Sequence, residues 1–82
     1  MKIVSIDWHD AWSYDEQCNI DVAEVRCMKP LNVKTLGFLV VEDENCIVVA
    51  RDLLQEDNKV CGILHIPKGW IDKIEIIKDD DV

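Results

Sequence analysis

Basic residues are few in this 82-residue chain, which has 9 Lys and Arg against 17 Asp and Glu and a formal net charge of −8 at pH 7. The Lys and Arg residues are scattered singly, so the sequence contains no basic stripe. A protein that binds a nucleic-acid backbone needs such a stripe to neutralise phosphates and release counterions. Direct nucleic-acid binding is therefore not expected. An acidic surface suits a basic protein partner, or it serves solubility alone.

Long apolar runs are also absent. No stretch approaches the roughly 18 apolar residues of a membrane-spanning helix, and the first ten residues, MKIVSIDWHD, lack the apolar segment of a signal peptide. We therefore expect no membrane association and a cytoplasmic location, where the four cysteines stay reduced. Cys46 and Cys61 lie in apolar runs, which predicts that both are small core residues.

The spacings that mark metal sites and catalytic motifs are missing. Successive cysteines are separated by 8, 18 and 14 residues, and the two histidines lie 56 positions apart. Zinc sites use close pairs such as C-x-x-C or two His on one helix face. The three glycines are isolated, which excludes a phosphate-cradling loop, and no G-x-S-x-G motif is present. We expect no metal, no cofactor and no enzymatic activity; an enzyme or a zinc protein is the alternative to a binding protein.

The patterns that are present are mainly those of β-strands. Val4, Ile6 and Trp8 alternate with polar residues, which is typical of a strand with one buried face. Residues 19–29 predict a short helix or helical turn that Pro30 ends. Further strands are predicted at residues 33–43, 45–53, 60–67 and 70–77. Isolated glycines within two of these apolar runs, Gly37 and Gly62, predict bulges or sharp bends.

Five strands in so short a chain cannot form a large sandwich, whereas curling into a barrel removes the exposed edges. The predicted fold is mainly β: a small five-stranded SH3-like or Sm-like barrel with a short helical insert after the first strand. It forms one domain over residues 1–78, followed by an acidic tail at 79–82. Because 49% of the residues are apolar and the domain is small, part of this apolar surface is expected in a homo-oligomeric interface.

The segments VKTLGFLVVEDENCIVVARDLL and VCGILHIPKGWIDKIEII carry a family resemblance. Together with an N-terminal strand that ends in Trp and is followed by Trp and Ser, they resemble a group of short, largely uncharacterised bacteriophage and prophage proteins. The resemblance covers most of residues 1–77, and the segment NIDVAEVRC departs from it. It implies a phage context, in which small non-enzymatic proteins often act by binding, and hence a location in the host cytoplasm.

Three aromatic residues, Trp8, Trp12 and Tyr14, fall within seven positions. Trp8 continues the apolar alternation of the first strand, so it is expected to fill one end of the core. Trp12 and Tyr14 lie outside any clear periodicity, and amphipathic aromatics on loops favour interfaces or the stacking of flat ligands. We predict that Trp12 and Tyr14 belong to a recognition loop.

Three further candidates for ligand binding are basic or titratable: Arg51, His65 and Lys68. His65 precedes Pro67 near the predicted barrel corner; the simplest interpretation is a half-buried strand histidine. Two hypotheses follow. In the first, a homo-oligomeric binding module captures a small nucleotide-like ligand to antagonise host defence, with aromatics on the base and Arg51, Lys68 or backbone N–H groups on the phosphates. In the second, an acidic inhibitor or adaptor binds a basic host protein through carboxylates at 15, 16, 42–44 and 79–81.

Overall fold

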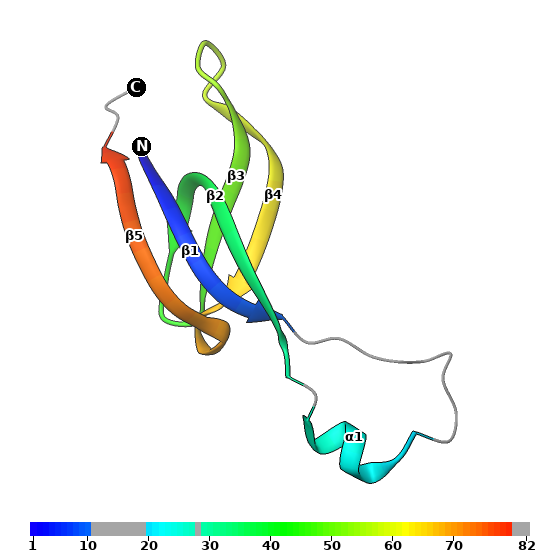
Figure 1. Cartoon of the computed structure of the whole chain (residues 1–82). Coiled ribbons are helices and arrows are strands. Elements are labelled where there is room, and N and C mark those ends of the chain that lie inside the picture. Colours follow the sequence, from blue (N-terminus) through cyan, green and yellow to red (C-terminus); the bar gives the residue numbers. More distant parts are fainter. Residues whose placement is uncertain (11–19, 28, 80–82) are drawn as a thin grey trace.

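The computed structural model describes residues 1–10, 20–27 and 29–79 (Figure 1). The elements are β1 (Lys2–Asp10), α1 (Val22–Cys27), β2 (Leu31–Glu42), β3 (Cys46–Leu54), β4 (Lys59–Pro67), the 3₁₀ turn η1 (Lys68–Trp70) and β5 (Ile71–Asp79). The prediction of a mainly β fold with five strands and a short helix after the first is confirmed. β5 extends to Asp79, the first residue of the predicted acidic tail.

All five strands belong to one antiparallel sheet, in the order β4-β3-β2-β1-β5. The twelve-residue strand β2 is shared between two halves of this sheet. Its residues 31–38 pair with β1, and its residues 38–42 pair with β3. Phe38 takes part in both pairings, opposite Ile3 on one side and Ala50 on the other. The sheet therefore consists of a β5–β1–β2 half and a β2–β3–β4 half that meet near Phe38.

The core lies between these two halves. Its buried side chains come from β1 (Val4, Ile6 and Trp8), from β3 (Ile47 and Val49) and from β4 (Ile66). β1 and β3 are not neighbours in the sheet, so their side chains share a core only because the sheet bends about β2. A register shift in β2, between Leu39 and Val41, lies where the bend is needed, and bulges increase local twist and bending. The prediction that Trp8 fills the core is confirmed.

The predicted closure into a barrel is wrong. β4 and β5 are the two edges of the sheet, and no ladder joins them within residues 59–79. Closure would require these edges to approach to the roughly 4.8 Å that separates paired strands. Instead, the last pairing between β2 and β3 is at Phe38 and Ala50, and beyond it β3 pairs only with β4. The end of this hairpin extends past β2, so the sheet stays open (Figure 1).

The two strand glycines have different roles from the predicted bulges. The β1–β2 pairing runs in register through Gly37, which lies opposite Val4. A Cβ atom on Gly37 would lie 2.8 Å from the backbone oxygen of Ala50, so glycine is needed because β3 approaches closely. Gly62 has a φ of +68°, and Arg51 covers it. Gly62 therefore supplies an unusual backbone conformation between the pairs Ala50–Ile63 and Asp52–Cys61, which keep the same register.

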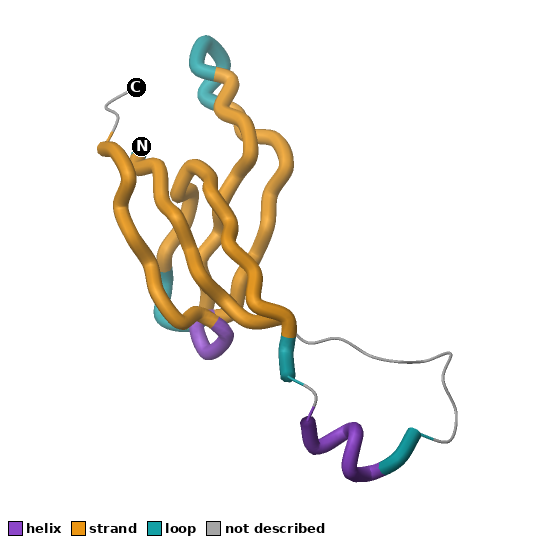
Figure 2. The backbone as a smooth tube through the Cα atoms, in the orientation of Figure 1, coloured by secondary structure: helices purple, strands orange, loops and turns teal. Residues whose placement is uncertain are grey.

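The helix α1 is short (Figure 2), and none of its residues is buried. Asp21 caps its first turn, because its side-chain oxygen accepts a hydrogen bond from the backbone N–H of Ala23 at 3.2 Å. Val22 and Val25 are both exposed. A six-residue helix gains little from propensity alone, so α1 contributes little to the stability of the sheet.

Adding one methyl group at Gly37 tests the close packing of β2 on β3. We expect Gly37→Ala to lower the free energy of unfolding by about 1–3 kcal/mol, because the new Cβ must displace backbone of β3. Gly69→Ala is the matched control, since a Cβ at Gly69 meets nothing within 4 Å; its effect should stay within about 0.5 kcal/mol. Urea denaturation of both variants measures the difference, and equal stabilities would contradict this account.

Candidate functional site

The predicted ligand-binding residues Arg51, His65 and Lys68 lie on β3, β4 and η1, whereas Trp12 and Tyr14 lie outside the described residues. Arg51 is exposed, and its Nε donates a hydrogen bond to Asp52 Oδ2 at 2.8 Å, which raises the pKa of the guanidinium. Lys68 Nζ lies 3.9 Å from Glu42 Oε1. His65 pairs with Val48 and is exposed, so the prediction of a half-buried histidine is wrong. Its neighbour Ile66 is buried in the core, so His65 extends from the opposite face of β4.

These three side chains do not share one site within a single chain. Pro67, next to Lys68, pairs with Cys46, and Arg51 lies five residues further along β3. At roughly 3.3 Å per residue, this places the two backbones about 16 Å apart along the strand. The residue opposite His65 is Val48, an odd number of positions from Arg51, so His65 and Arg51 extend from opposite faces of the sheet.

A hollow of about 360 Å³ lies where β1 ends and where β2 and β5 begin. We call it the Trp8 hollow; its lining residues are Asp7, Trp8, Asn32, Val33, Lys34 and Asp72. The β1–β2 register produces this arrangement, because it places Trp8 opposite Val33 and Asp7 opposite Lys34. The side chains of the first pair pack on the core face of the sheet, and those of the second pair lie on the opposite face, where they border the hollow. The second pair forms an ion pair of 3.2 Å at the rim.

Asp72 enters the lining because of a bulge. In the β1–β5 pairing, Asp7 lies opposite Lys73 and Trp8 lies opposite Ile71, so the register shifts at the intervening Asp72. Bulges re-aim side chains, and they are frequent beside functional sites. The Asp72 carboxylate lies 3.2 Å from Nδ1 of His9, which links β5 to the end of β1.

The indole of Trp8 is held on the core face by two contacts. Its Nε1 donates a hydrogen bond to Thr35 Oγ1 at 2.9 Å. Its ring stacks on Trp70 of η1, with centroids 6.5 Å apart and planes inclined by 15°. Sequence reasoning placed Trp8 in the core but did not single out Asn32, Val33, Lys34 or Asp72. The alternation of β2 could have paired Val33 with Trp8, whereas the bulge at Asp72 leaves no signal in the sequence.

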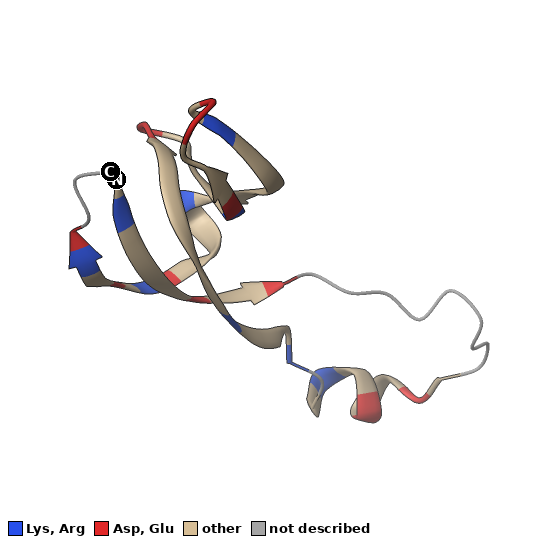
Figure 3. Ribbon diagram, turned by 90° about the horizontal axis from the view of Figure 1, so that it is seen from above, with Lys and Arg blue, Asp and Glu red and all other residues tan. Residues whose placement is uncertain are grey.

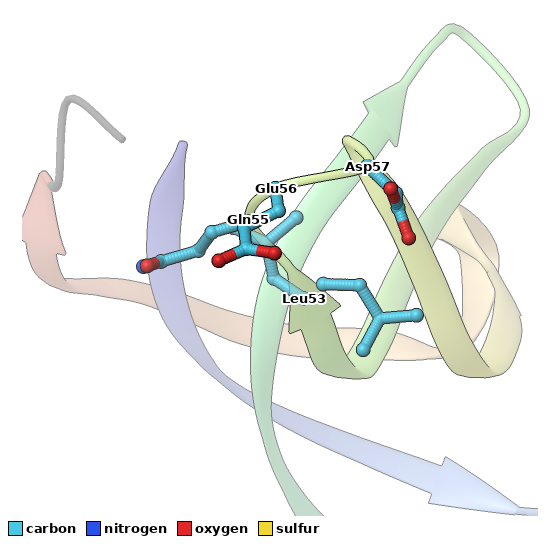
Figure 4. A pocket seen from close by; sticks show the side chains of 5 residues that line it. Leu53, Gln55, Glu56 and Asp57 are labelled. Carbon is cyan, nitrogen blue, oxygen red and sulfur yellow. The ribbon is translucent and has the colours of Figure 1, made fainter.

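A second hollow, also of about 360 Å³, lies at the turn between β3 and β4 (Figure 4). It is lined by Leu53, Leu54, Gln55, Glu56 and Asp57. All five residues belong to one turn and the strand end before it, so a single hairpin tip forms this hollow. Its shape therefore depends on one local segment of chain.

The acidic residues of the described chain are distributed rather than gathered on one face. Residues 42–44 lie before β3 and residues 56–57 lie after it, so these two acidic turns lie at opposite ends of that strand. Figure 3 shows Asp and Glu interspersed with Lys and Arg along the ribbon. A partner that contacts one acidic turn is therefore not placed to contact the other through the same flat surface.

Asp43 organises the turn between β2 and β3. Its Oδ1 accepts hydrogen bonds from the backbone N–H groups of Asn45 and Cys46, each at 2.8 Å. These bonds favour the ionised carboxylate and lower the pKa of Asp43 below its ordinary value of 3.8. The bond from Cys46 has the larger effect and the bond from Asn45 the smaller. The role of this carboxylate is to hold the turn that leads into β3.

The cysteines of the described residues are free. Cys46 is half-buried, whereas Cys27 and Cys61 are exposed. The prediction of a core position for Cys61 is wrong: it pairs with Asp52 on the edge strand β4, where its side chain faces away from the core. Within residues 1–10, 20–27 and 29–79, no three His, Cys, Asp or Glu side chains are grouped so that they could hold a metal ion.

Comparisons with known proteins yield no relative of this chain: no family model, no curated protein and no solved structure matches it. The resemblance to phage proteins therefore stays a prediction. In the same described ranges, no helix has the length and apolar character required to cross a membrane. The function must accordingly be argued from the geometry of the chain itself.

The lowered pKa of Asp43 predicts a pH-dependent contribution to stability. A carboxyl group whose folded-state pKa is depressed stabilises the fold above its unfolded pKa, and this stabilisation is lost as the pH falls through the folded pKa. Asp43→Asn keeps an acceptor oxygen but removes the charge, so wild type should be more stable than the variant at pH 7. The difference should disappear as the pH falls below 3.8.

Chemical denaturation between pH 2 and pH 7 measures this difference. Glu44→Gln is the control, because it removes the same charge from the same turn without touching the Asp43 hydrogen bonds. A difference between wild type and Asp43→Asn that did not change with pH would contradict the role assigned to the carboxylate.

Proposed function

We propose that this chain is a non-enzymatic binding module that works as a homo-oligomer and assembles through the open side of its sheet, between β4 and β5. The observation that carries the proposal is the exposure of apolar side chains at both edges. Leu64 on β4 is 38% exposed, and Ile74 and Ile76 on β5 are 41% and 57% exposed. Exposed apolar patches on small proteins mark interaction surfaces.

These edge residues belong to the core-facing side of the sheet. Ile74 pairs with the buried Ile6, and Ile76 pairs with the buried Val4. Leu64 likewise pairs with the buried Val49. Paired residues of adjacent strands lie on the same face. The three side chains therefore extend the core outward on both edges, and they are uncovered because the sheet does not close.

A second copy of the chain fits this open side chemically. Full burial of a Leu or Ile side chain contributes about 1.5–3 kcal/mol, so covering the exposed part of each edge residue contributes on the order of 1 kcal/mol. The edge strands also present unpaired backbone N–H and C=O groups, which another strand can satisfy. A β4 edge from one copy set against a β5 edge from the next would bury both apolar rims at once.

We further propose that the fold is related to SH3-like or Sm-like barrels, with a sheet that stays open within one copy. Two observations support it: the sheet order β4-β3-β2-β1-β5, and the short η1 turn that redirects the chain between the fourth and fifth strands. In this proposal, contact between copies replaces the missing contact between the edges of one chain.

We also propose that this module belongs to a phage and captures a nucleotide-like ligand. Arg51 and Lys68 would hold the ligand together with Trp12 and Tyr14. Arg51 and Lys68 lie about 16 Å apart along the strand direction within one chain, by the roughly 3.3 Å rise per residue. Each also faces a carboxylate, Asp52 and Glu42 respectively. A phosphate site that uses both cations therefore requires two copies, and assembly is the property to test first.

Native mass spectrometry of the purified chain tests assembly, and we expect a defined oligomer. Ile74→Lys and Leu64→Lys should each reduce it to monomer, because a charge then occupies one apolar edge. Leu36→Lys is the control: Leu36 is 64% exposed, but its neighbour Thr35 pairs with the buried Ile6, so Leu36 lies on the opposite face. This variant should assemble like wild type, and far-UV circular dichroism verifies that all three variants fold.

A mixture of the two edge variants tests whether the β4 edge of one copy meets the β5 edge of another. Ile74→Lys keeps an intact β4 edge, and Leu64→Lys keeps an intact β5 edge. If β4 of one copy meets β5 of the next, the mixture forms dimers that neither variant forms alone. A wild-type chain that remains monomeric at all concentrations would overturn the proposal.

A further inference from the structure

We propose that His65 on β4 of one copy pairs with Glu75 on β5 of the next copy, and that this contact sets how the two edges align. The inference rests on the assembly proposed above and deepens it, because it names the polar contact that selects the partner edge. The apolar rims lie on the core face of the sheet, whereas His65 and Glu75 lie on the opposite face.

His65 is a polar residue between two core-facing residues of an edge strand. Its neighbours Leu64 and Ile66 extend from the core face of β4, so His65 extends from the other face, where it lies opposite Val48. The side chain is exposed, and its imidazole has no hydrogen bond or ion pair within the part of the chain that the structure describes. A strand added to the β4 edge would therefore bring the first polar partner to this imidazole.

Glu75 has the same setting on the other edge. Ile74 and Ile76 extend from the core face of β5, so Glu75 extends from the opposite face, where it pairs with Ser5. Its side chain is exposed, and Nζ of Lys73 lies 3.8 Å from its Oε1. An exposed ion pair of this length contributes little to stability. The carboxylate therefore keeps the capacity to accept a hydrogen bond from a neighbouring copy.

The apolar rims and the charges agree on one contact between the edges. Leu64 covers the β5 rim when it lies opposite Ile74 or Ile76. In a parallel pair with Leu64 opposite Ile74, the two polar residues meet, and in an antiparallel pair with Leu64 opposite Ile76 they meet again. Residues directly opposite each other have Cβ atoms about 5 Å apart, which is within reach of these side chains. In the other two alignments the imidazole meets no carboxylate; it lies opposite Lys73 or Ile77.

The same charges disfavour the pairing of either edge with itself. β4 carries no carboxylate, and its titratable side chains are Lys59, Cys61 and His65. A second β4 edge therefore offers His65 no opposite charge. A second β5 edge, antiparallel and with its two isoleucines against those of the first, sets Glu75 against Glu75. Like charges directly opposite destabilise a strand pair, so the charges favour β4 against β5.

Charge reversal at about pH 6, where histidine is ordinarily mostly protonated, tests the contact. His65→Glu and Glu75→Lys should each raise the chain concentration at which half of the copies are assembled by roughly threefold or more, because like charges then meet between copies. The double variant carries an opposite pair again and should assemble within about twofold of wild type. Sedimentation velocity over a concentration series measures assembly, and far-UV circular dichroism verifies that each variant folds.

The control reverses the same charges away from the two edges. Arg26 and Glu24 are exposed on α1, so Arg26→Glu and Glu24→Lys should each assemble like wild type. If wild type assembles but the double variant is no better than the weaker single variant, the contact is overturned and assembly through the open side stands. A loss in the control variants equal to that in the edge variants would overturn it as well. A monomeric wild type would overturn both proposals.

Discussion

The bend of a single sheet about β2 is the constraint on which the rest of this structure depends. β1 supplies Val4, Ile6 and Trp8 to the core, and β3 supplies Ile47 and Val49, yet these strands are not neighbours. They share a core because one half of β2 pairs with each of them and a register shift lies between the two halves. Gly37 contributes by permitting the close approach of the Ala50 backbone. Without the bend, the side chains that are now buried between the two halves would be exposed on one flat face of the sheet.

The same bend explains why this small chain leaves so much apolar surface uncovered. It brings the two halves together at β1 and β3 but does not bring the edges β4 and β5 into contact. The core therefore ends in open rims that carry Leu64, Ile74 and Ile76. A domain of this size buries only about 60% of its unfolded surface. Association with another copy is the simplest way to shield the remainder from water.

The end of the sheet near Trp8 has a different physical character from these rims. Here a bulge and an ion pair border a small hollow, and a pair of stacked indoles packs on the other face of the sheet. The open rims and this hollow draw on separate residues.

The sequence by itself determined the strands, the short helix and the place of Trp8 in the core, because alternation and β-branched runs are local signals. It also pointed to uncovered apolar surface through the high apolar content of a short chain. Only the tertiary structure decided that the sheet stays open, that Cys61 and His65 face solvent, and that Arg51 and Lys68 lie far apart. These properties depend on register and on the position of bulges, which are set by pairing between distant segments. A register shift at Asp72 makes a strand position part of the lining of a hollow, and no local pattern of residues predicts it.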